Sequence, residues 1–430
     1  MHGVGKSPGA TTDRHDPGHD LRTSRLMLLM LVTMTGVAPI SLYILVPALP
    51  VLAAAFKSDI QLAQMTVSLY MVGIACSQLI MGPLSDKFGR RPVLLAGLGL
   101  MVAASLGASL AQTLPQLIAA RFLQALGGAS GMVISRAIIR DLYSRDRVGA
   151  MISLVIAVMM TAQMLSALAG GLLEITFGWR AIFYVITAAS FGVATLLAIA
   201  LPETRRERGA RVSFRGDVGS LIKDRAFVGY VLCLVLASQI IFAFAGGGPY
   251  IVVTQMGRTT AEYGAWFAAT GFAFLLGNLL CVRFAPHHSL EKLIWFGLAL
   301  QLAGSFLNLI WSFAGINQAP GWLFGTQMLV MVANAFVMAN ASAGAISVRP
   351  DAAGTASGAM GFLQQGVGAL VSQFGAWLGG HSSTTLPLTS AILALSIACA
   401  SVMFLLVPRS HVVVSEELIE EAEEEEAGLM

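Results

Sequence analysis

The chain has 430 residues, of which 56% are hydrophobic and only 11% are charged, and its mean hydropathy is +0.76. Globular soluble proteins have a charged fraction of about 25%, because charge covers the surface that meets water. This composition therefore excludes a water-soluble protein and predicts lipid as the solvent for most of the chain. The net charge of +3 is small and forms no basic patch, which argues against a nucleic-acid partner.

Twelve apolar runs follow a polar N-terminal tail over residues 1–25, and each approaches the length of about 20 residues that a membrane-spanning helix needs. The first run is too long for the core of a signal peptide and has no clear cleavage site after it, so we expect a retained span. Runs of this length satisfy their backbone hydrogen bonds in lipid as helices. The expected spans lie approximately at 26–48, 61–82, 93–112, 116–138, 148–172, 180–201, 226–248, 262–283, 290–312, 321–345, 355–378 and 386–407.

A polar segment over 202–225 separates these runs into two sets of six, which suggests an internal duplication. The sequence therefore predicts an all-α membrane protein with two pseudo-symmetric six-helix bundles, at 26–201 and 226–408. We expect 202–225 to be a linker and the glutamate-rich segment 409–430 to be a solvated tail. A monomer in the lipid bilayer is the expected state.

Lysine and arginine are distributed unevenly between the two sides of this topology. If the N-terminus is cytoplasmic, 22 of the 26 basic residues lie in or beside inside segments. Only Lys57, Arg180 and Arg258 lie in outside loops, and Arg121 falls within a span. By the positive-inside rule, both termini and the linker are expected to be cytoplasmic.

The densest charged stretch between two spans is GPLSDKFGRRP, which joins the second and third spans. It resembles the signature loop of the major facilitator superfamily, G-x-x-x-D-x-x-G-R-R, at Gly82, Asp86, Gly89, Arg90 and Arg91. RFLQALGGASG in the fourth span resembles the arginine motif of proton-coupled members, and LPET at 201–204 resembles the motif that closes span six.

Longer stretches resemble one branch of that superfamily, the bicyclomycin- and chloramphenicol-type resistance exporters. They are YMVGIACSQLIMGPLSDKFGRRPVLLAG, GWRAIF and AGTASGAMGFLQQ, and the resemblance extends over roughly residues 26–408. It implies a bacterial inner-membrane protein in which one bundle rocks against the other around a midplane site. It also implies a small-molecule substrate and protons as the coupling ion.

The charged loop is expected to act as a conformational latch. Gly82 and Gly89 would permit a tight turn between antiparallel helices, and Asp86 could accept hydrogen bonds from arginines and a helix N-terminus. The resemblance implies that the partner helix is span eleven, near Gly354–Ser357, with Arg90 and Asp141 completing the cluster. The alternative is a basic loop that only fixes membrane orientation, for which Asp86 and the glycines would be unnecessary.

Arg121 lies inside the fourth span, where a charge is costly and is by default a functional candidate. Its alternative role is an anchor that reaches the membrane interface. Gln124 lies one turn further along, and Gly127 and Gly131 provide a small face for close helix approach. We therefore favour an inward-facing role in coupling or substrate binding.

The fifth span ends with small and acidic residues. Gly170 and Gly171 occupy the place of a family antiporter motif, G-x-x-x-G-P-x-x-G-G, but its proline is missing here, so we expect helix packing. Glu174 follows near the outer interface, and Glu262 follows Thr259 by three residues, which is a capping-box pattern. Both glutamates are also coupling candidates.

The first span has no acidic residue, although exporters of this family commonly carry one just before the stretch that reads VPALP here. Leu42 and Tyr43 occupy that region, and Tyr43 is the substrate candidate. No other span has a carboxylate near its midpoint, so an organic cation would lack a counter-charge. The cysteines and histidines show no metal-ligand spacing, and no metal or cofactor is expected.

The sequence favours a proton-coupled exporter of small lipophilic compounds, expected to be neutral, such as antibiotics. A neutral compound and an anion paired with Arg121 both remain open. A symporter that imports a metabolite would usually carry more polar and charged side chains at mid-depth. A membrane-embedded enzyme would need convergent catalytic acids, histidines or metal ligands, and none is apparent, so the chain is not expected to be an enzyme.

The topology gives a direct prediction. A reporter that is active only in the periplasm, fused after Arg409, should be silent, because the basic residues hold that end in the cytoplasm. The same reporter inserted in an outside loop beside Arg258 should be active. Activity after Arg409 would contradict the whole topology.

Overall fold

The computed structural model describes residues 17–142, 145–204, 223–316, 319–348 and 353–407, and all regular elements within these ranges are helices. The first bundle, called the N half, consists of α1 (Pro17–Tyr43), η1 (Val46–Ala48), α2 (Leu49–Ala55), α3 (Ile60–Phe88), α4 (Arg90–Ser109), α5 (Leu114–Gly128), α6 (Ser130–Leu142), α7 (Arg145–Phe177) and α8 (Trp179–Ala200). The second bundle, called the C half, consists of α10 (Arg225–Pro249), η2 (Tyr250–Gln255), α11 (Thr260–Phe284), η3 (Ala285–His287), α12 (Leu290–Phe313), α13 (Pro320–Val348), α14 (Ala353–His381) and α15 (Leu386–Leu406).

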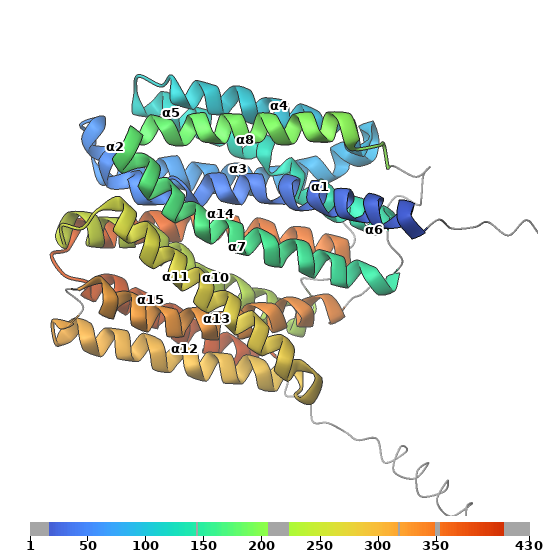
Figure 1. Ribbon diagram of the computed structural model, residues 1–430. Helices are drawn as coiled ribbons and strands as arrows, with labels where there is room; N and C mark the ends of the chain where they lie inside the picture. Colours follow the sequence, from blue (N-terminus) through green and yellow to red (C-terminus); the bar gives the residue numbers. More distant parts are fainter. Residues whose placement is uncertain (1–16, 143–144, 205–222, 317–318, 349–352, 408–430) are drawn as a thin grey trace, which may run out of the picture.

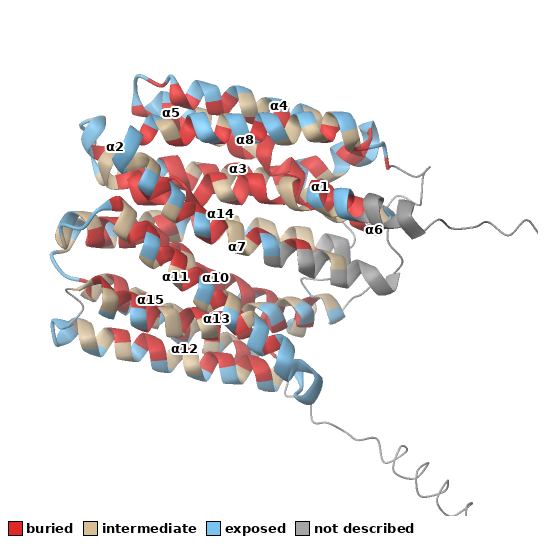
Figure 2. Ribbon diagram, in the orientation of Figure 1, coloured by how far each residue is buried: buried red, intermediate tan, exposed pale blue. Residues whose placement is uncertain are grey.

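The long helices lie roughly side by side along one axis, with most of the N half in the upper part of Figure 1 and most of the C half below it. We call the end where α3 meets α4, at Gly89, the charged end, and the end where α3 begins, at Ile60, the opposite end. The inner helices are buried and the outer ones are not: 78% of the most apolar window of Arg225–Gln255 is buried, against 28% for α8 (Figure 2). The exposed faces are apolar, as Phe191 and Ile199 on α8 show. Lipid is the solvent that suits such a surface.

Eleven helical segments in the described ranges are long and apolar enough to cross a membrane, where the sequence predicts twelve spans. The remaining segment, α14, has 29 residues but carries Gln364, Gln365 and Gln373. It packs against α3 and α10 inside the protein, where polar side chains find protein partners instead of lipid. A helical segment therefore occupies each of the twelve expected runs, and α14 is identified as a span by its length and packing and not by its hydropathy.

Three segments differ from the expected boundaries. α1 begins at Pro17, inside the segment expected to be a tail. After Tyr43 the chain continues as the short helices η1 and α2, which contain Pro47 and Pro50, and proline cannot donate a backbone hydrogen bond within a helix. The fourth span is two helices, α5 and α6, on either side of Ala129. Most of the linker, at 205–222, and the acidic tail from 408 lie outside the described residues.

The expected turn at Gly82 is wrong, because α3 continues through Gly82 to Phe88. The turn lies at Gly89, which has a φ of 103°, a conformation that a residue with a Cβ rarely adopts. A Cβ there would also lie 2.7 Å from Oε2 of Glu203. Gly89 alone therefore provides the turn between α3 and α4.

The two halves meet along two helix pairs, α7 with α11 and α3 with α14, and we call these contacts the seam. Small residues bring α7 and α11 together: a Cβ on Gly171 would lie 2.4 Å from the carbonyl oxygen of Thr260. A Cβ on Gly264 would lie 2.5 Å from the carbonyl oxygen of Ala167. The backbones of the two halves thus approach closely, as small residues allow in membranes.

Glycines also hold helices together within the N half. A Cβ on Gly131 of α6 would lie 1.9 Å from the carbonyl oxygen of Met34 on α1, and one on Gly170 would lie 1.8 Å from that of Ile44. Gly127 approaches Gly97 of α4 in the same way. These three glycines lie where the sequence analysis expects close packing.

We predict that Gly131→Val destabilises the protein, because the side chain has no room beside the backbone of α1. Overpacking of this kind costs about 1–3 kcal/mol, so the melting temperature of the detergent-purified protein should fall by several degrees. Gly99→Val on α4 is the matched control, since a Cβ there meets nothing within 4 Å. Equal melting temperatures for the two variants would contradict the packing.

Candidate functional site

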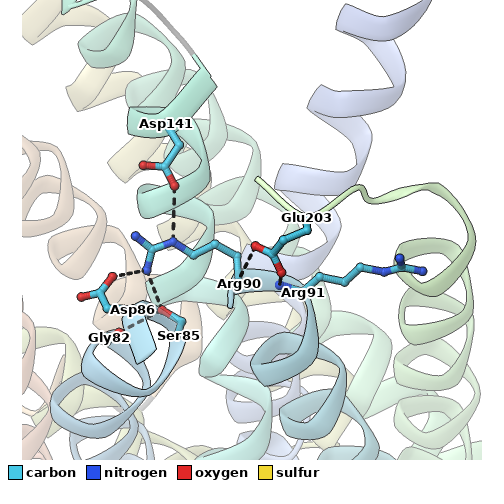
Figure 3. A network of polar contacts seen from close by, with 7 residues as sticks. All are labelled: Gly82, Ser85, Asp86, Arg90, Arg91, Asp141 and Glu203. Atoms are coloured by element: carbon cyan, nitrogen blue, oxygen red, sulfur yellow. Dashed lines mark hydrogen bonds and ion pairs between the residues drawn. The ribbon is translucent and has the colours of Figure 1, made fainter. Parts of the chain in front are cut away.

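Arg90 is the centre of a polar network at the charged end (Figure 3). Its Nη1 donates to Oδ1 of Asp86 at 2.5 Å and to Oγ of Ser85 at 2.7 Å, and its Nε donates to Oδ2 of Asp141 at 3.3 Å. The Arg90 side chain is 10% exposed, whereas that of Asp86 is 65% exposed. The network therefore ties the end of α3, the start of α4 and the end of α6 into one unit.

Glu203, directly after α8, completes this network. Its carboxylate accepts hydrogen bonds from the backbone N–H groups of Arg90 and Arg91, at 2.9 and 3.1 Å. These N–H groups are at the first turn of α4, where donors have no partner within the helix and a negative charge is stabilised by the helix dipole. Nη2 of Arg91 donates to the carbonyl oxygen of Ala198 at 2.5 Å, so α8 is fixed to α4 twice.

The partners of this network, among the residues whose side chains the structure describes, all belong to the N half. The expected grouping of Asp86, Arg90 and Asp141 is present. The expected contact of Asp86 falls near Gly354–Ser357, and the side chains of 353–355 lie outside the described residues. The contact of the latch with span eleven therefore stays a prediction.

A different residue bridges the two halves at the charged end. Nη1 of Arg136, on α6, donates to Oγ of Ser357 on α14 at 3.3 Å. Ser357 lies in the segment where the sequence analysis places the partner of the latch. Among the described residues, the contact at that place is thus made by Arg136 and not by Asp86.

Arg121 is fully buried between α1, α3 and α5, which does not fit an anchor that reaches the membrane interface. Its Nε donates to the carbonyl oxygen of Thr66 at 3.3 Å, and its Nη1 lies 2.5 Å from Oε1 of Gln124 and 3.0 Å from Oγ of Ser41. The guanidinium carbon lies 3.8 Å from the centre of the Tyr70 ring, which is a cation–π contact. Every one of these partners is uncharged.

The second amino group of Arg121, Nη2, is buried and has no hydrogen-bond partner. No salt bridge reaches Arg121 in the described ranges. An unsatisfied buried donor on a charged group costs more than about 1–3 kcal/mol. This donor is therefore available to an acceptor atom that reaches the site.

Glu174 joins the halves at the opposite end. Its Oε2 accepts a hydrogen bond of 2.6 Å from Oγ1 of Thr260, the first residue of α11. The other candidate carboxylate, Glu262, lies on the first turn of α11, and its backbone N–H donates to Oγ1 of Thr259 at 3.1 Å. Glu174 therefore makes a bond across the seam, whereas Glu262 belongs to a helix cap.

Uncharged side chains join α3 to α14 near the opposite end. Nε2 of Gln64 donates to Oγ of Ser372 at 2.8 Å, and Oγ of Ser68 donates to Oε1 of Gln373 at 2.9 Å. Nε2 of Gln373 in turn donates to the carbonyl oxygen and to Oε1 of Gln61, both at 2.8 Å. This part of the seam contains no charge, so it can open without exposing an ion to lipid.

Tyr43 takes part in an aromatic contact between the halves. Its ring centre lies 5.7 Å from that of Phe267 on α11, and Phe267 stacks on Tyr263 at 5.8 Å. Tyr263 contacts Phe324 of α13, and its buried hydroxyl has no partner. Gln327, one turn from Phe324, is also buried, with both amide atoms unpartnered. Aromatic rings of both halves thus lie where the halves meet, together with unpartnered polar atoms of the C half.

Sequence reasoning missed several of these contacts. Glu203 lies in the LPET motif at 201–204, but only the fold brings its carboxylate to the start of α4. Arg136 is one of the 22 basic residues in or beside inside segments, and nothing in its local pattern indicates a partner far away in the sequence. The glutamines of α3 look like isolated polar residues until α14 is placed beside them.

The described residues contain no group of three or more His, Cys, Asp or Glu that could hold a metal ion. The fold does bring Cys233 and Cys399 together, with their sulfur atoms 3.4 Å apart between α10 and α15. Both side chains are fully buried. They pack as small apolar groups within the C half.

Comparison with known proteins identifies a family and relatives that this chain resembles. The family model described as Major Facilitator Superfamily matches residues 31–373. The chain is 26% identical to the bicyclomycin resistance protein homolog of Haemophilus influenzae, over 81% of this chain and 88% of the relative. It is 29% identical to multidrug resistance protein D of Escherichia coli, over 80% of this chain and 87% of the relative.

A solved structure of the xylose transporter of Escherichia coli, described as partially occluded and inward open, has the same fold. The TM-score is 0.71 at 15% sequence identity, over 90% of this chain and 98% of that one. At this identity the likeness concerns the fold alone. It agrees with an all-helical bundle built from two halves.

Proposed function

The chain belongs to the Major Facilitator Superfamily, and from this premise we propose that it exports small lipophilic compounds, such as antibiotics, by proton-coupled alternating access. Relatives that are named for multidrug and bicyclomycin resistance support drug efflux as the activity. A family of transporters also argues for transport and against an enzyme. The N-terminus, the charged end and the linker would face the cytoplasm of a bacterial cell, and the opposite end would face the periplasm.

The seam is the observation that carries this proposal. It is made of close backbone contacts at Gly171 and Gly264, of hydrogen bonds between uncharged side chains of α3 and α14, and of the bond between Glu174 and Thr260. The uncharged contacts can break and form again without leaving a charge in lipid, as alternating access requires. The one carboxylate among them, Glu174, lies in the last turn of α7, near the membrane interface. In this conformation these contacts hold the opposite end closed.

The midplane favours substrates without a positive charge. Described carboxylates lie at or near helix ends, while Arg121 supplies a positive charge within the N half. A cation between Tyr43 and Phe267 would lack a counter-charge in a medium of low dielectric constant. A neutral compound, or an anion paired with Arg121, avoids this cost.

Glu174 is the carboxylate whose position best suits coupling among Asp86, Asp141, Glu174 and Glu262. Asp86 and Asp141 are paired with Arg90 inside one half, and Glu262 lies at a helix cap. Glu174 contacts the other half through Thr260, so closing and opening that end changes its surroundings. Arg121 would act on substrate charge, since its hydrogen-bond partners are all neutral.

We predict that Asp86→Asn leaves the protein inserted and abundant but lowers efflux about fivefold or more. In the present conformation the exposed pair with Arg90 contributes only about 0.2–1 kcal/mol, so folding should survive. A charge-assisted bond made by Asp86 in one access state would bias the two states by about 1–3 kcal/mol. The measurement is drug accumulation in exporter-deficient cells, normalised to the amount of protein in the membrane.

Asp59→Asn is the matched control, because Asp59 caps the other end of α3 and asparagine caps helices equally well. Its efflux should equal that of the unaltered protein. Normal efflux by a fully expressed Asp86→Asn variant would contradict the hypothesis that Asp86 is part of a conformational latch.

We predict that a neutral amphenicol is exported and that ethidium, a permanent cation, is not. The reason is the missing counter-charge at the midplane. Efflux of both compounds is measured in everted vesicles with and without a proton gradient, for the unaltered protein and for Arg121→Ala. Arg180→Ala, at the opposite end, serves as the control.

Strong ethidium efflux by the unaltered protein would contradict the charge argument. Amphenicol efflux that persists after the proton gradient is collapsed would contradict proton coupling. Accumulation of amphenicol on the cytoplasmic side, driven by the gradient, would favour a symporter.

A further inference from the structure

Two arginines of the fourth span lie inside the bundle and make no salt bridge within the described ranges. Arg121 is fully buried on α5, and Arg136, partly buried on α6, reaches across the seam to Ser357. Fifteen residues separate them, which corresponds to about 22 Å along a helix. One arginine thus lies near the charged end and the other deep within the N half.

Arg90 differs from these two arginines in its partners. Arg90 contacts the carboxylates of Asp86 and Asp141, so its charge is compensated. The acceptors around Arg121 are carbonyl, hydroxyl and amide oxygens, and the acceptor for Arg136 is a hydroxyl. Dipoles of this kind lower the cost of a buried guanidinium but leave its net charge in place.

Arg121 also has an unused donor. Its Nη2 carries two N–H groups, is buried and has no partner among the described atoms. Arginine binds carboxylate, sulfonate and phosphate oxygens through such N–H groups, and these charge-assisted bonds are stronger than bonds to neutral acceptors. An anionic group beside Nη2 would satisfy both the donor and the charge.

Arg136 is placed to meet an anion first. It lies at the seam near the charged end, and its bond to Ser357 is long at 3.3 Å and has a neutral acceptor. When the halves separate at that end, this bond must break and the guanidinium becomes free to bind another acceptor. A stronger, charged acceptor on an entering compound can replace the serine.

Resting on the proposed export function, we propose that Arg136 and Arg121 are two successive binding positions for an anionic group on the exported compound. The substrate class is an amphiphile with an aromatic or aliphatic body and one carboxylate or sulfonate. Arg136 takes the anion at the charged end, and Arg121 compensates it at the midplane. The aromatic residues around Tyr43 and Phe267 contact the apolar body.

The test compares two probes of nearly equal shape, naphthalene-1-sulfonate and naphthalene-1-sulfonamide. The sulfonate stays charged at all working pH values, and the sulfonamide is neutral. The full-length protein is reconstituted in proteoliposomes, and KM and kcat are measured for both probes. Variants are Arg136→Gln, Arg136→Lys and Arg121→Lys, with Arg180→Gln as the control outside this route.

We expect the unaltered protein to transport the sulfonate. Arg136→Gln should raise the KM for the sulfonate about tenfold, the loss of one bond between charged groups, and change the KM for the sulfonamide less than twofold. Arg136→Lys should restore most of the affinity, because it restores the charge. Arg121→Lys should lower kcat for the sulfonate more than for the sulfonamide, since lysine cannot reproduce the fork of donors.

Three outcomes would overturn the proposal. Equal losses for both probes in Arg136→Gln would show that Arg136 only holds the halves together. Transport of the sulfonamide but not the sulfonate would remove the anion positions and leave the export function standing. Transport that requires chloride, with no preference for the sulfonate, would show that Arg136 and Arg121 bind an inorganic anion and not an anionic group of the substrate. If neither probe nor any antibiotic is moved, the export function itself fails.

Discussion

The cost of an unpaired charge in lipid is the constraint on which the rest of this structure depends. The carboxylates whose side chains the structure describes lie at or near helix ends, where several of them cap helices or contact arginines. They are Asp59, Asp86, Asp141, Glu174, Glu203, Asp224, Glu262 and Glu291. Since carboxylates are kept out of the helix middles, most contacts between the two halves use uncharged groups. Arg121 and Arg136 are charged residues within the fourth span, and this position makes them functional candidates.

The two ends of the protein differ in the contacts that their polar residues make. At the charged end, Arg90 and Glu203 bind α3, α4, α6 and α8 into one rigid unit within the N half. At the opposite end, Gln64, Ser68 and Glu174 make bonds that cross to the C half. One end is thus stiffened within a half, while the other is closed between halves. A rocking motion needs both features, because rigid bodies must move against an interface that can break.

Much of the fold follows from the sequence because hydrophobic length is set by the thickness of the bilayer. The expected spans agree with the helices to within a few residues, except at α1, whose start at Pro17 lies in a polar segment. α14 does not meet a hydropathy criterion, because its glutamines lower the mean hydropathy of a helix that packs against α3 and α10. One of them, Gln373, bonds to side chains of α3. Local composition therefore predicts where helices lie but not which of them are internal.

The site was less predictable, because its contacts join residues that are distant in the sequence. The grouping of Arg90 with Asp86 and Asp141 could be expected from the resemblance, and it is present. The bond between Arg136 and Ser357 of span eleven could not be expected, since it depends on how α6 and α14 are rotated about their axes. Glu203 and the glutamines of α3 have the same dependence on tertiary packing. Sequence patterns therefore indicate which polar and charged residues are candidates, whereas tertiary packing determines which of them form hydrogen bonds with each other.

The proposed alternating-access mechanism requires that the N half moves relative to the C half. Spin labels at Gln112 and Ser383 would report the distance between the halves at the opposite end, and labels at Leu142 and His287 would report it at the charged end. Both distances would be measured by pulsed electron resonance, with and without chloramphenicol, in a variant that lacks the partly buried Cys76. The account predicts that one distance lengthens while the other shortens. Distances that stay fixed, or that change in the same sense at both ends, would contradict it.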